Sequence, residues 1–468
     1  MKKEMKNYRI SRWCKYFVAD DIIALFHSIS LAVIFVPISI GKKFLSLTDT
    51  KKTKQEIILE LGEDVVNLLF QENIIVSDEY NDMDCLIKTR KRLVSEISLE
   101  MMYLLLTDQC NLKCSYCFED TPSTPSSFKE MLMSKKTARE ALKLFARLTK
   151  KYGKVDKQKI IHLYGGEPLL NPTVVKDIIL NVETLKQEGV MPLNCNVVIV
   201  TNGVLLTEDL AQFFAENNVS VGISIDGPKH INNIYRIAKN SKIDVFERAK
   251  FSFNLLKKYG VKTGLSVTLT PEAIKSFDQV LNCFIKDFSA SDGINFNILH
   301  FNPMVHTNAE YFELAAKSLI TAFKKFREIG MHEERMMRKA HSFINREPIF
   351  ADCGVIGNQI VVAPDGQIGV CQDFVKPRQY FKGSVYDDNY DPITSGLFSE
   401  WCRRSPFFME KCFDCEALGI CGGGCPASAE LKTGCRWNID ERICFHSKLS
   451  LEWLIWDTYF QLNLKENK

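Results

Sequence analysis

Three cysteines in one short stretch are the residues of this sequence best suited to chemistry. Cys110, Cys114 and Cys117 are spaced Cys-x3-Cys-x2-Cys within TDQCNLKCSYCFED. Three thiolates at this spacing can bind three irons of a cubane [4Fe–4S] cluster, which leaves the fourth iron open to a small chelating molecule. A structural zinc site needs a fourth Cys or a His close by, and this stretch has neither. The spacing therefore predicts a cluster at which chemistry takes place.

The composition is that of a globular protein with metal-binding thiols. The chain has 468 residues, of which 46% are hydrophobic and 25% charged, and its length favours two or three domains. The net charge of +3 gives no electrostatic argument for a nucleic-acid partner. Sixteen cysteines, two pairs of them in Cys-x2-Cys spacing, in a sequence without a signal peptide indicate metal binding in a reducing cytoplasm rather than disulfides.

One apolar segment resembles a membrane span by its length. Residues 22–40 carry no formal charge and approach the ~20 residues that cross a bilayer. Val, Ile and Phe dominate the segment, however, and His27, Ser28, Ser30 and Pro37 interrupt it. The pattern predicts two short strands followed by a helix, and no membrane span.

From residue 100 onward, apolar strands alternate with amphipathic helices. Continuous apolar strands in such an alternation favour a parallel sheet with helices outside, and no dinucleotide-binding glycine pattern is present. The sequence therefore predicts an α/β fold, a partial (β/α)6 barrel, with its chemistry at the carboxyl ends of the strands. The predicted strands are residues 101–107, 159–164, 196–201, 219–225, 261–269 and 293–301.

The rest of the chain divides around this barrel. Residues 1–78 predict a small α+β unit, and the charged residues 79–99 predict a linker. Residues 100–345 form the predicted barrel, and residues 346–468 form a cysteine-rich domain that ends in a helix.

Polar residues and glycines follow two of the other predicted strands. The second strand ends in Gly165, Gly166 and Glu167, and the fourth ends in Ser224 and Asp226. Paired glycines let the backbone approach a ligand closely, and a carboxylate beside them can receive an ammonium group. A hydroxyl and a carboxylate on one strand suit ribose hydroxyls. Each pattern alone is typical of a turn, but their place beside the cysteine loop indicates a binding site.

These features resemble the radical S-adenosylmethionine (SAM) enzymes. Members of this family carry Cys-x3-Cys-x2-Cys after the first barrel strand, with an aromatic residue, here Tyr116, before the last Cys, and a GGEP sequence after the second strand. The resemblance implies that Cys110, Cys114 and Cys117 hold a [4Fe–4S] cluster whose open iron binds the amino and carboxylate groups of SAM. One electron, from a reductant such as flavodoxin or ferredoxin, then yields a 5′-deoxyadenosyl radical that abstracts a substrate hydrogen.

The same resemblance assigns roles to the residues at the strand ends. Gly165, Gly166 and Glu167 are expected to border the SAM amino group, and Ser224 and Asp226 to face its ribose. Arg236 is expected either to meet the SAM carboxylate or to form an exposed salt bridge.

Nine cysteines lie beyond residue 350, and seven of them form a second set. A bare Cys-x2-Cys pair favours a zinc ribbon, but the order of these seven cysteines resembles the SPASM extension of radical SAM enzymes. That resemblance implies two auxiliary [4Fe–4S] clusters. The first is assigned to Cys353, Cys371 and Cys425, and the second to Cys412, Cys415, Cys421 and Cys444.

The first auxiliary cluster has one cysteine too few. Anaerobic sulfatase maturases supply another Cys shortly before the position of Cys353, but the stretch INREPIFADC has no cysteine ahead of Cys353. Cys402 or Cys435 can fill the place, or the iron stays open for a substrate thiolate. The sulfatase maturases also carry an Asp directly after the Cys equivalent to Cys371, whereas here Gln372 precedes the candidate catalytic base, Asp373.

The N-terminal unit resembles the winged-helix-like peptide-binding domain found ahead of many ribosomal-peptide maturases. Such domains bind a leader peptide as an added strand. The alternative is a stabilising cap on the barrel.

Together the resemblances predict a radical SAM maturase of a ribosomally synthesised precursor peptide, which joins a cysteine sulfur to a carbon as a thioether. Formylglycine formation in a sulfatase and carbon–carbon cross-linking of a peptide are the alternatives among enzymes. An iron–sulfur or zinc scaffold that binds a peptide without catalysis is the alternative outside them.

Overall fold

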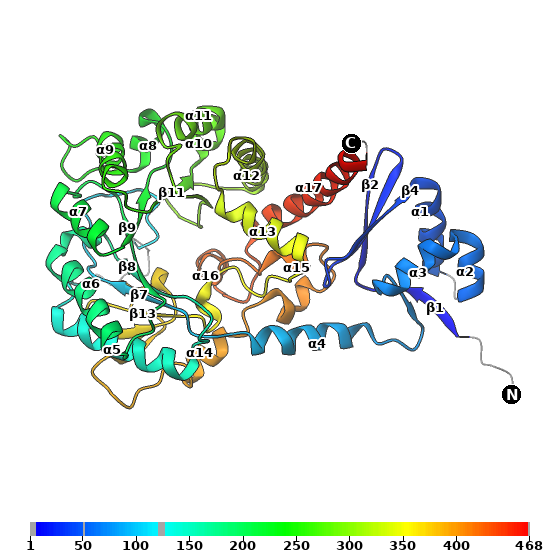
Figure 1. The fold of residues 1–468 in the computed structure, drawn as a ribbon, viewed down its shortest axis with the longest axis horizontal. Coiled ribbons are helices and arrows are strands. Elements are labelled where there is room, and N and C mark those ends of the chain that lie inside the picture. Colours follow the sequence, from blue (N-terminus) through cyan, green and yellow to red (C-terminus); the bar gives the residue numbers. More distant parts are fainter. Residues whose placement is uncertain (1–5, 50–51, 120–126, 467–468) are drawn as a thin grey trace.

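Three parts follow one another along the length of the molecule. The computed structural model describes residues 6–49, 52–119 and 127–466. The small N-terminal unit lies at one end, the barrel at the other, and the cysteine-rich C-terminal part between them (Figure 1).

The N-terminal unit is built on two small sheets. One is an antiparallel sheet in the order β2-β3-β4, and the other has the order β5-β1-β6. Three helices pack on them through buried side chains such as Phe44, Ile57 and Leu69. The strands are β1 (Asn7–Ile10), β2 (Cys14–Ala19), β3 (Ile22–His27), β4 (Val33–Pro37), β5 (Lys52–Thr53) and β6 (Ile75–Ser77), and the helices are α1 (Ile38–Leu45), α2 (Lys54–Leu61) and α3 (Glu63–Gln71).

The apolar segment of residues 22–40 is therefore β3, β4 and the start of α1, as predicted. Within the described ranges, no helix is long and apolar enough to cross a membrane.

The predicted linker contains a helix, α4 (Asp82–Ser95), which runs from the N-terminal unit toward the barrel (Figure 1). The side chain of Asn81 caps it by accepting a hydrogen bond from the backbone N–H of Met83 at 3.1 Å. Leu86 and Leu93, seven residues apart on one face, are buried, while the charged residues cover the remaining faces. The high charge of this segment predicted a linker, and the helix within it was not part of that prediction.

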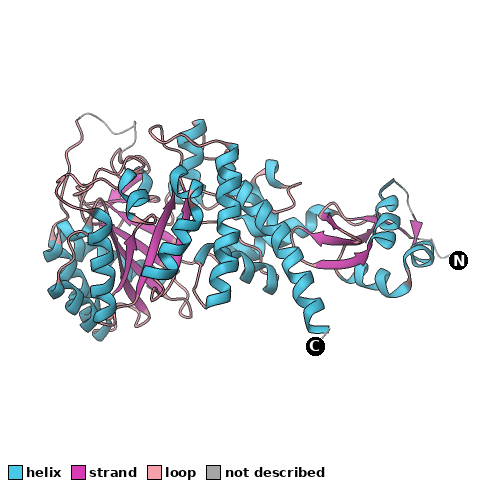
Figure 2. Cartoon of the chain, turned by 90° about the horizontal axis from the view of Figure 1, so that it is seen from above, coloured by secondary structure: helices cyan, strands magenta, loops and turns pink. Residues whose placement is uncertain are grey.

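The partial barrel is confirmed. Six parallel strands lie in the order β12-β11-β10-β9-β8-β7, and in Figure 2 they stand inside a layer of helices. Each predicted strand is present with shifts of a few residues at its ends. The strands are β7 (Met101–Leu105), β8 (Lys159–Tyr164), β9 (Cys195–Thr201), β10 (Ser220–Ser224), β11 (Thr263–Leu269) and β12 (Ile294–Ile298).

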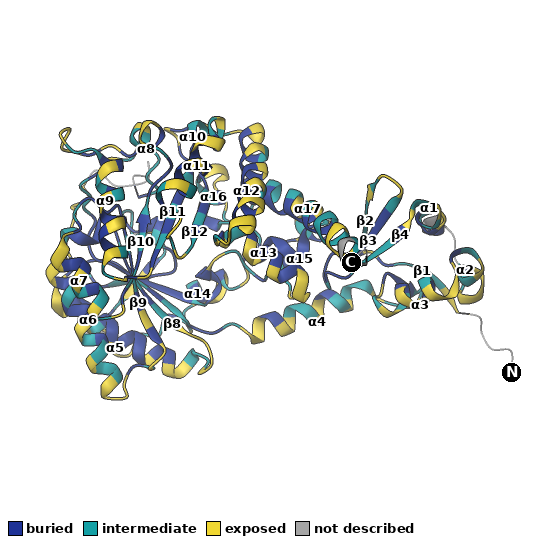
Figure 3. Cartoon of the chain, turned by 45° about the horizontal axis from the view of Figure 1, so that its top comes forward, coloured by how far each residue is buried: buried dark blue, intermediate teal, exposed yellow. Residues whose placement is uncertain are grey.

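The helices of the barrel bury one face against the strands and expose the other (Figure 3). In α5, for example, Leu142, Phe145 and Leu148 are buried, while its lysines face outward. Because each helix packs one apolar face on the sheet, the strands stay parallel and their carboxyl ends lie along one rim of the barrel. The helices are α5 (Lys135–Tyr152), α6 (Pro172–Gln187), α7 (Glu208–Glu216), α8 (Lys229–Tyr235), α9 (Val245–Lys258), α10 (Pro271–Lys275), α11 (Phe277–Asp287), α12 (Ala309–Ile329) and α13 (Glu334–Asn345).

The sheet of the barrel continues into the C-terminal part. β13 (Gln359–Val362) pairs in parallel with β7, and β14 (Gln367–Gly369) and β15 (Phe381–Ser384) extend the sheet to nine strands. This pairing was not predicted, because β7 and β13 are more than 250 residues apart and no local pattern links them. The helices of this part are α14 (Gly396–Trp401), α15 (Leu418–Cys421), α16 (Pro426–Thr433) and α17 (Glu441–Glu466).

The N-terminal unit contacts the C-terminal part through aromatic packing, hydrogen bonds and a close backbone approach. The ring of Phe35 on β4 lies 5.1 Å from that of Tyr459 on α17. The guanidinium of Arg12 donates two hydrogen bonds of 2.8 Å to the carboxylate of Asp414. A Cβ atom placed on Gly419 would lie 2.6 Å from the side chain of Leu31, so these two segments are in close contact.

Candidate active site and metal centres

The loop with Cys110, Cys114 and Cys117 leaves the carboxyl end of β7 and contacts the end of β8. The backbone N–H of Gly166 donates to Thr107 O, and that of Glu167 donates to Gln109 O, both at 2.9 Å. A Cβ atom on Gly166 would lie only 2.1 Å from Gln109 O. The paired glycines therefore let the cysteine loop itself approach the strand end, a role that their predicted approach to a ligand did not include.

The three thiols of this loop lie partly buried. Cys110 Sγ accepts a hydrogen bond of 3.4 Å from the backbone N–H of Leu112. Burial raises the pKa of Cys110 to about 12, and the charges of Glu167, Cys114 and Glu119 add to the effect. Such thiols become thiolates only beside a strong positive charge, which iron provides. The donor set of the loop therefore fits the predicted cluster.

Glu167 is occupied by protein groups. Its side chain is 1% exposed. The carboxylate accepts hydrogen bonds from Thr201 Oγ1 at 2.7 Å, from the N–H of Asn202 at 2.8 Å and from the N–H of Leu169 at 3.0 Å. Burial raises its pKa, although these three bonds favour the charged form. Glu167 therefore ties β8 to β9, and its carboxylate has little capacity left for a SAM ammonium.

Asp226 is likewise used within the protein. The Tyr116 hydroxyl donates to its carboxylate, which also accepts from the N–H of Thr268 at 2.9 Å. Burial raises the pKa of Asp226, and the charge of Arg236 only partly offsets this. Asp226 thus fixes Tyr116, between Cys114 and Cys117, to the fourth and fifth strands, instead of presenting a free carboxylate to a ribose. Ser224, at the end of β10, is partly exposed.

Arg236 lies beside this pair. Its side chain is 7% exposed, so the expectation of an exposed salt bridge was wrong. Arg236 NH1 donates to the Tyr116 hydroxyl at 2.9 Å, and Cys114 is among the charges that act on the guanidinium. Arg236 Nε is buried without a hydrogen-bond partner in the described part of the chain. A buried unpaired donor beside the cysteine loop fits an anionic group such as the SAM carboxylate.

Sequence reasoning missed Asn202, which follows β9. Its side-chain amide donates to Asn111 Oδ1 at 2.8 Å, and the same nitrogen lies 3.9 Å from Cys110 Sγ. Like the predicted residues, Asn202 occupies the carboxyl end of a barrel strand, and that position was the signal available for finding it.

The structure brings together the four cysteines of the second auxiliary set. Burial raises the pKa of Cys444 far above its usual value, and Cys421, Cys412 and Cys415 are the next largest influences. Four thiols that share one buried region, from α17 and from the segment around α15, match the ligand number of a closed cluster.

The three cysteines of the first auxiliary set also form a group. Burial raises the pKa of Cys371 well above its usual value, and the charges of Asp373, Cys425 and Cys353 act on it. The electrostatic neighbours of Cys402 include none of these three thiols, and Cys435 is exposed. In the described residues, neither therefore stands out as the missing ligand.

Buried cations surround the auxiliary cysteines. Arg404 and Arg442 are only 2% and 4% exposed. Burial lowers the pKa of Arg404, while Asp440, Cys425 and Cys412 oppose the shift. Thiolate-ligated clusters are anionic, and buried arginines compensate such charge, so the surroundings fit two auxiliary clusters.

Asp373, the candidate base, belongs to the first auxiliary group. Its carboxylate is 5% exposed and lies 3.3 Å from His300 Nδ1, after the sixth barrel strand. Burial raises the pKa of Tyr164, and the charges of Asp373 and Cys117 add to the effect. Its ring stacks on Phe118 at 6.2 Å. The barrel rim and the first auxiliary group therefore face one shared aromatic region.

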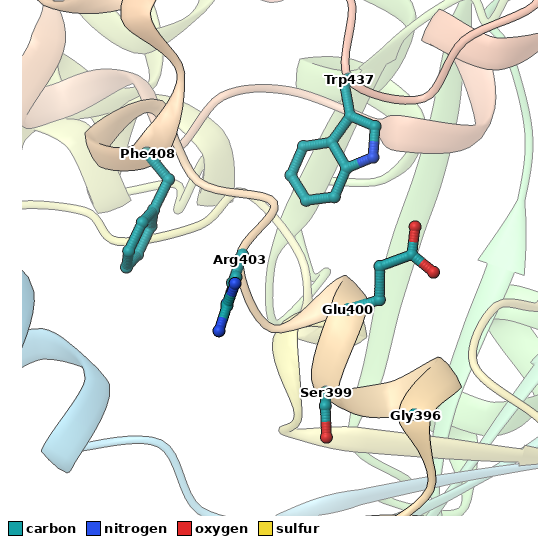
Figure 4. Close-up of a pocket in the computed structure, with 6 residues that line it drawn as sticks. All are labelled: Gly396, Ser399, Glu400, Arg403, Phe408 and Trp437. Atoms are coloured by element: carbon teal, nitrogen blue, oxygen red, sulfur yellow. The ribbon is translucent and has the colours of Figure 1, made fainter.

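A surface pocket of about 590 Å³ lies elsewhere, on the C-terminal part. Phe408 and Trp437 line it on opposite sides, with Arg403 between them in the view of Figure 4. None of the predicted ligands or SAM-binding residues lines it. The chemistry suggested by the cysteines is therefore not centred on this pocket.

Comparisons with known proteins agree with this arrangement. The sequence profile of the Radical SAM superfamily matches residues 104–284, from β7 to α11. The radical SAM cyclopropyl synthase TigE of Paramaledivibacter caminithermalis is 24% identical, over 93% of this chain and 93% of its own length. A serine-type anaerobic sulfatase-maturating enzyme of Bacteroides thetaiotaomicron is 31% identical, over 69% of this chain and 81% of its own length.

A solved structure shares the fold. The crystal structure of Streptococcus suis SuiB bound to the precursor peptide SuiA has a TM-score of 0.55 and 15% identity. The likeness covers 93% of this chain and 99% of that one, so it includes most of the N-terminal unit.

Proposed function

The chain belongs to the radical SAM superfamily, and on this premise we propose that it matures a ribosomally synthesised precursor peptide. As a radical SAM enzyme it uses SAM and a [4Fe–4S] cluster, which supply the 5′-deoxyadenosyl radical. We assign that cluster to Cys110, Cys114 and Cys117. The proposed reaction is the joining of a cysteine sulfur to a carbon of the peptide as a thioether. A flavodoxin or ferredoxin is the proposed electron donor.

The N-terminal unit is the observation that carries the choice of a peptide substrate. TigE and SuiB each match 93% of the chain, which requires most of this unit, whereas the sulfatase-maturating relative matches 69%. SuiB was solved with a precursor peptide. The unit has an antiparallel sheet with two open edges, β2 and β4, and an extended peptide can add to such an edge. We therefore propose that residues 1–78 bind a leader peptide.

The hydrogen-bond pattern shows which backbone groups are free at those edges. Ser28 N donates to Trp13 O, and His27 N donates to Ala32 O, each at 2.9 Å. Because the pattern alternates along antiparallel strands, the N–H groups of Val18 on β2 and Phe35 on β4 point away from β3.

A proline at one of these two positions is expected to block leader binding. Val18→Pro removes a free N–H from the β2 edge and Phe35→Pro removes one from the β4 edge, without breaking the pairing with β3. Fluorescence anisotropy with a labelled leader peptide should show at least about a tenfold loss of affinity for one of the two variants, since several ladder bonds are lost.

Matched alanine variants separate backbone from side-chain effects. Val18→Ala and Phe35→Ala keep the N–H groups, and Phe35→Ala accounts for lost packing against α17. Unchanged affinity in both proline variants, with folding confirmed by circular dichroism, would contradict strand addition at these edges.

The first auxiliary group supports thioether formation. With three cysteines and no fourth, the cluster assigned to Cys353, Cys371 and Cys425 leaves one iron position that a substrate thiolate can occupy. The protein must then hold the acceptor carbon near both this position and the SAM-binding loop, which share the aromatic region around Tyr164.

Mass spectrometry tests the proposed reaction. Anaerobically reconstituted enzyme is incubated with SAM, a strong reductant and a cysteine-containing precursor peptide encoded beside it. We expect deoxyadenosine, the loss of a hydrogen pair per link, and thiols that no longer react with an alkylating agent. The loss of hydrogens with thiols still reactive would instead indicate a carbon–carbon bond, and the cyclopropyl synthase TigE, which matches 93% of the chain, is the relative that supports this alternative.

Formylglycine formation is the second candidate, favoured by the 31% identity with a sulfatase-maturating enzyme. A peptide containing a sulfatase-type cysteine or serine is the matched substrate. Its conversion to an aldehyde, with the precursor peptide unchanged, would replace the proposed function.

A further inference from the structure

We propose that His300 is the fourth ligand of the first auxiliary cluster, beside Cys353, Cys371 and Cys425. Among the described residues, His300, Asp373 and Cys425 are the group whose potential ligand atoms all lie within 4.8 Å of one another. Asp373 and Cys425 belong to the part of the chain that carries the auxiliary cysteines, and His300 belongs to the barrel.

The position of His300 follows from the fold. β12, the sixth barrel strand, ends at Ile298, and His300 stands two residues beyond it on the rim. The backbone N–H of Phe301 donates a hydrogen bond of 3.2 Å to Ser428 Oγ on α16, in the C-terminal part. Cys425 is the N-cap of the same helix. The rim segment that carries His300 is thereby anchored next to a cysteine of the first auxiliary group.

The imidazole has one nitrogen facing a carboxylate. His300 Nδ1 is buried and has no hydrogen-bond partner with good geometry in the described residues, yet it lies 3.3 Å from Asp373 Oδ2. The side chain as a whole is 35% exposed, and with Nδ1 facing the carboxylate, Nε2 is the ring nitrogen that remains for a metal. Metal-ligating histidines usually direct one N–H to a carboxylate and bind metal with the other nitrogen. The pair of His300 and Asp373 has that arrangement.

Charge favours histidine over aspartate as the ligand. Asp373 is 5% exposed and already acts electrostatically on Cys353, Cys371 and Cys425. A fourth anionic ligand in this buried region would add to three thiolates, whereas a neutral imidazole adds no charge. Histidine ligation of iron–sulfur centres is chemically established. We therefore assign iron binding to the imidazole and its orientation to Asp373.

The assignment has a consequence that rests on the proposed function. A neutral imidazole is a weaker ligand for cluster iron than a thiolate. His300 would hold this position in the resting protein, and a substrate thiolate, as the stronger ligand, could take its place there without any change of oxidation state. The position stays closed until a peptide arrives.

Pulsed electron paramagnetic resonance tests the ligand in the resting enzyme. The full chain is used with Cys110, Cys114 and Cys117 replaced by alanine, so that only the auxiliary clusters contribute. Reduced protein without SAM or peptide is expected to show a nitrogen coupling that changes with ¹⁵N-histidine labelling. His300→Ala should lose this coupling, and the control His306→Ala, six residues further along, should keep it.

Two further variants define the outcome. Asp373→Asn is expected to keep the nitrogen coupling, because the ligand remains. His300→Cys is expected to restore a four-thiolate cluster with full iron content and no coupling. The absence of a histidine coupling in the parent protein, its persistence in His300→Ala, or a single bound zinc ion at His300, Asp373 and Cys425 would overturn the assignment. Because no substrate is present, failure of thioether formation leaves this result unaffected.

Discussion

Replacing Cys114 by alanine is expected to abolish the formation of 5′-deoxyadenosine from SAM. Cys114 is the middle cysteine of the loop after β7, and the charge of Arg236 acts on the same site. A cubane held by two thiolates from one short loop loses iron, and without the open iron SAM is neither positioned nor reduced. Chromatography of anaerobic reactions should show deoxyadenosine at the level of the enzyme-free background.

A thiol outside the assigned centres is the control for this variant. Cys435 is exposed and Cys283 is buried in α11, and neither is assigned to a cluster. Cys435→Ala and Cys283→Ala are expected to retain deoxyadenosine formation. Normal turnover in Cys114→Ala would remove the cluster assignment for this loop.

Replacing Glu167 by alanine is expected to destabilise the protein strongly. The buried carboxylate accepts three hydrogen bonds, from Thr201, Asn202 and Leu169. Its removal leaves these donors without partners at the joint of β8 and β9, which should cost about 3–5 kcal/mol of unfolding free energy. Urea denaturation of the metal-free protein, followed by circular dichroism, measures the loss.

Glu167→Gln separates this supporting role from SAM binding. Glutamine keeps an acceptor oxygen for some of the donors, so it should lose clearly less stability than alanine. If the carboxylate serves only the strand joint, Glu167→Gln retains SAM binding in equilibrium dialysis. Wild-type stability in Glu167→Ala, or a glutamine variant that is stable yet does not bind SAM, would contradict the role derived from the hydrogen bonds.

The barrel could be predicted from the sequence because its signals are local. Each strand is a short apolar run beside an amphipathic helix, and the parallel order follows from that alternation. The extension of the sheet by β13 to β15 could not be predicted, since pairing between distant strands leaves no mark in either segment. α4 was missed for a different reason, because its high charge hid two buried leucines seven residues apart.

The site divides in the same way. Cysteine spacing is a local signal, and it identified the residues that the structure groups into three sets of thiols. The roles of Glu167, Asp226 and Arg236 depend on partners from other strands, such as Thr201, Thr268 and Tyr116. His300 carried no spacing signal at all, because its neighbours lie on a different part of the chain. The sequence could therefore indicate candidate residues at the strand ends, but not the side chains and backbone groups that they contact.

The attachment of the N-terminal unit bears on the lifetime of the enzyme in air. Arg12 donates hydrogen bonds to Asp414, which lies between Cys412 and Cys415 of the second auxiliary set. Leu31 contacts Gly419, two residues before Cys421 of the same set. The unit thus covers one side of the segment that carries these cysteines, and a cluster bound there would be reached by dioxygen or by an electron carrier only from its other sides. If the unit moved on binding the proposed leader peptide, it would uncover this segment, so the binding of the substrate and the exposure of the proposed cluster would be linked.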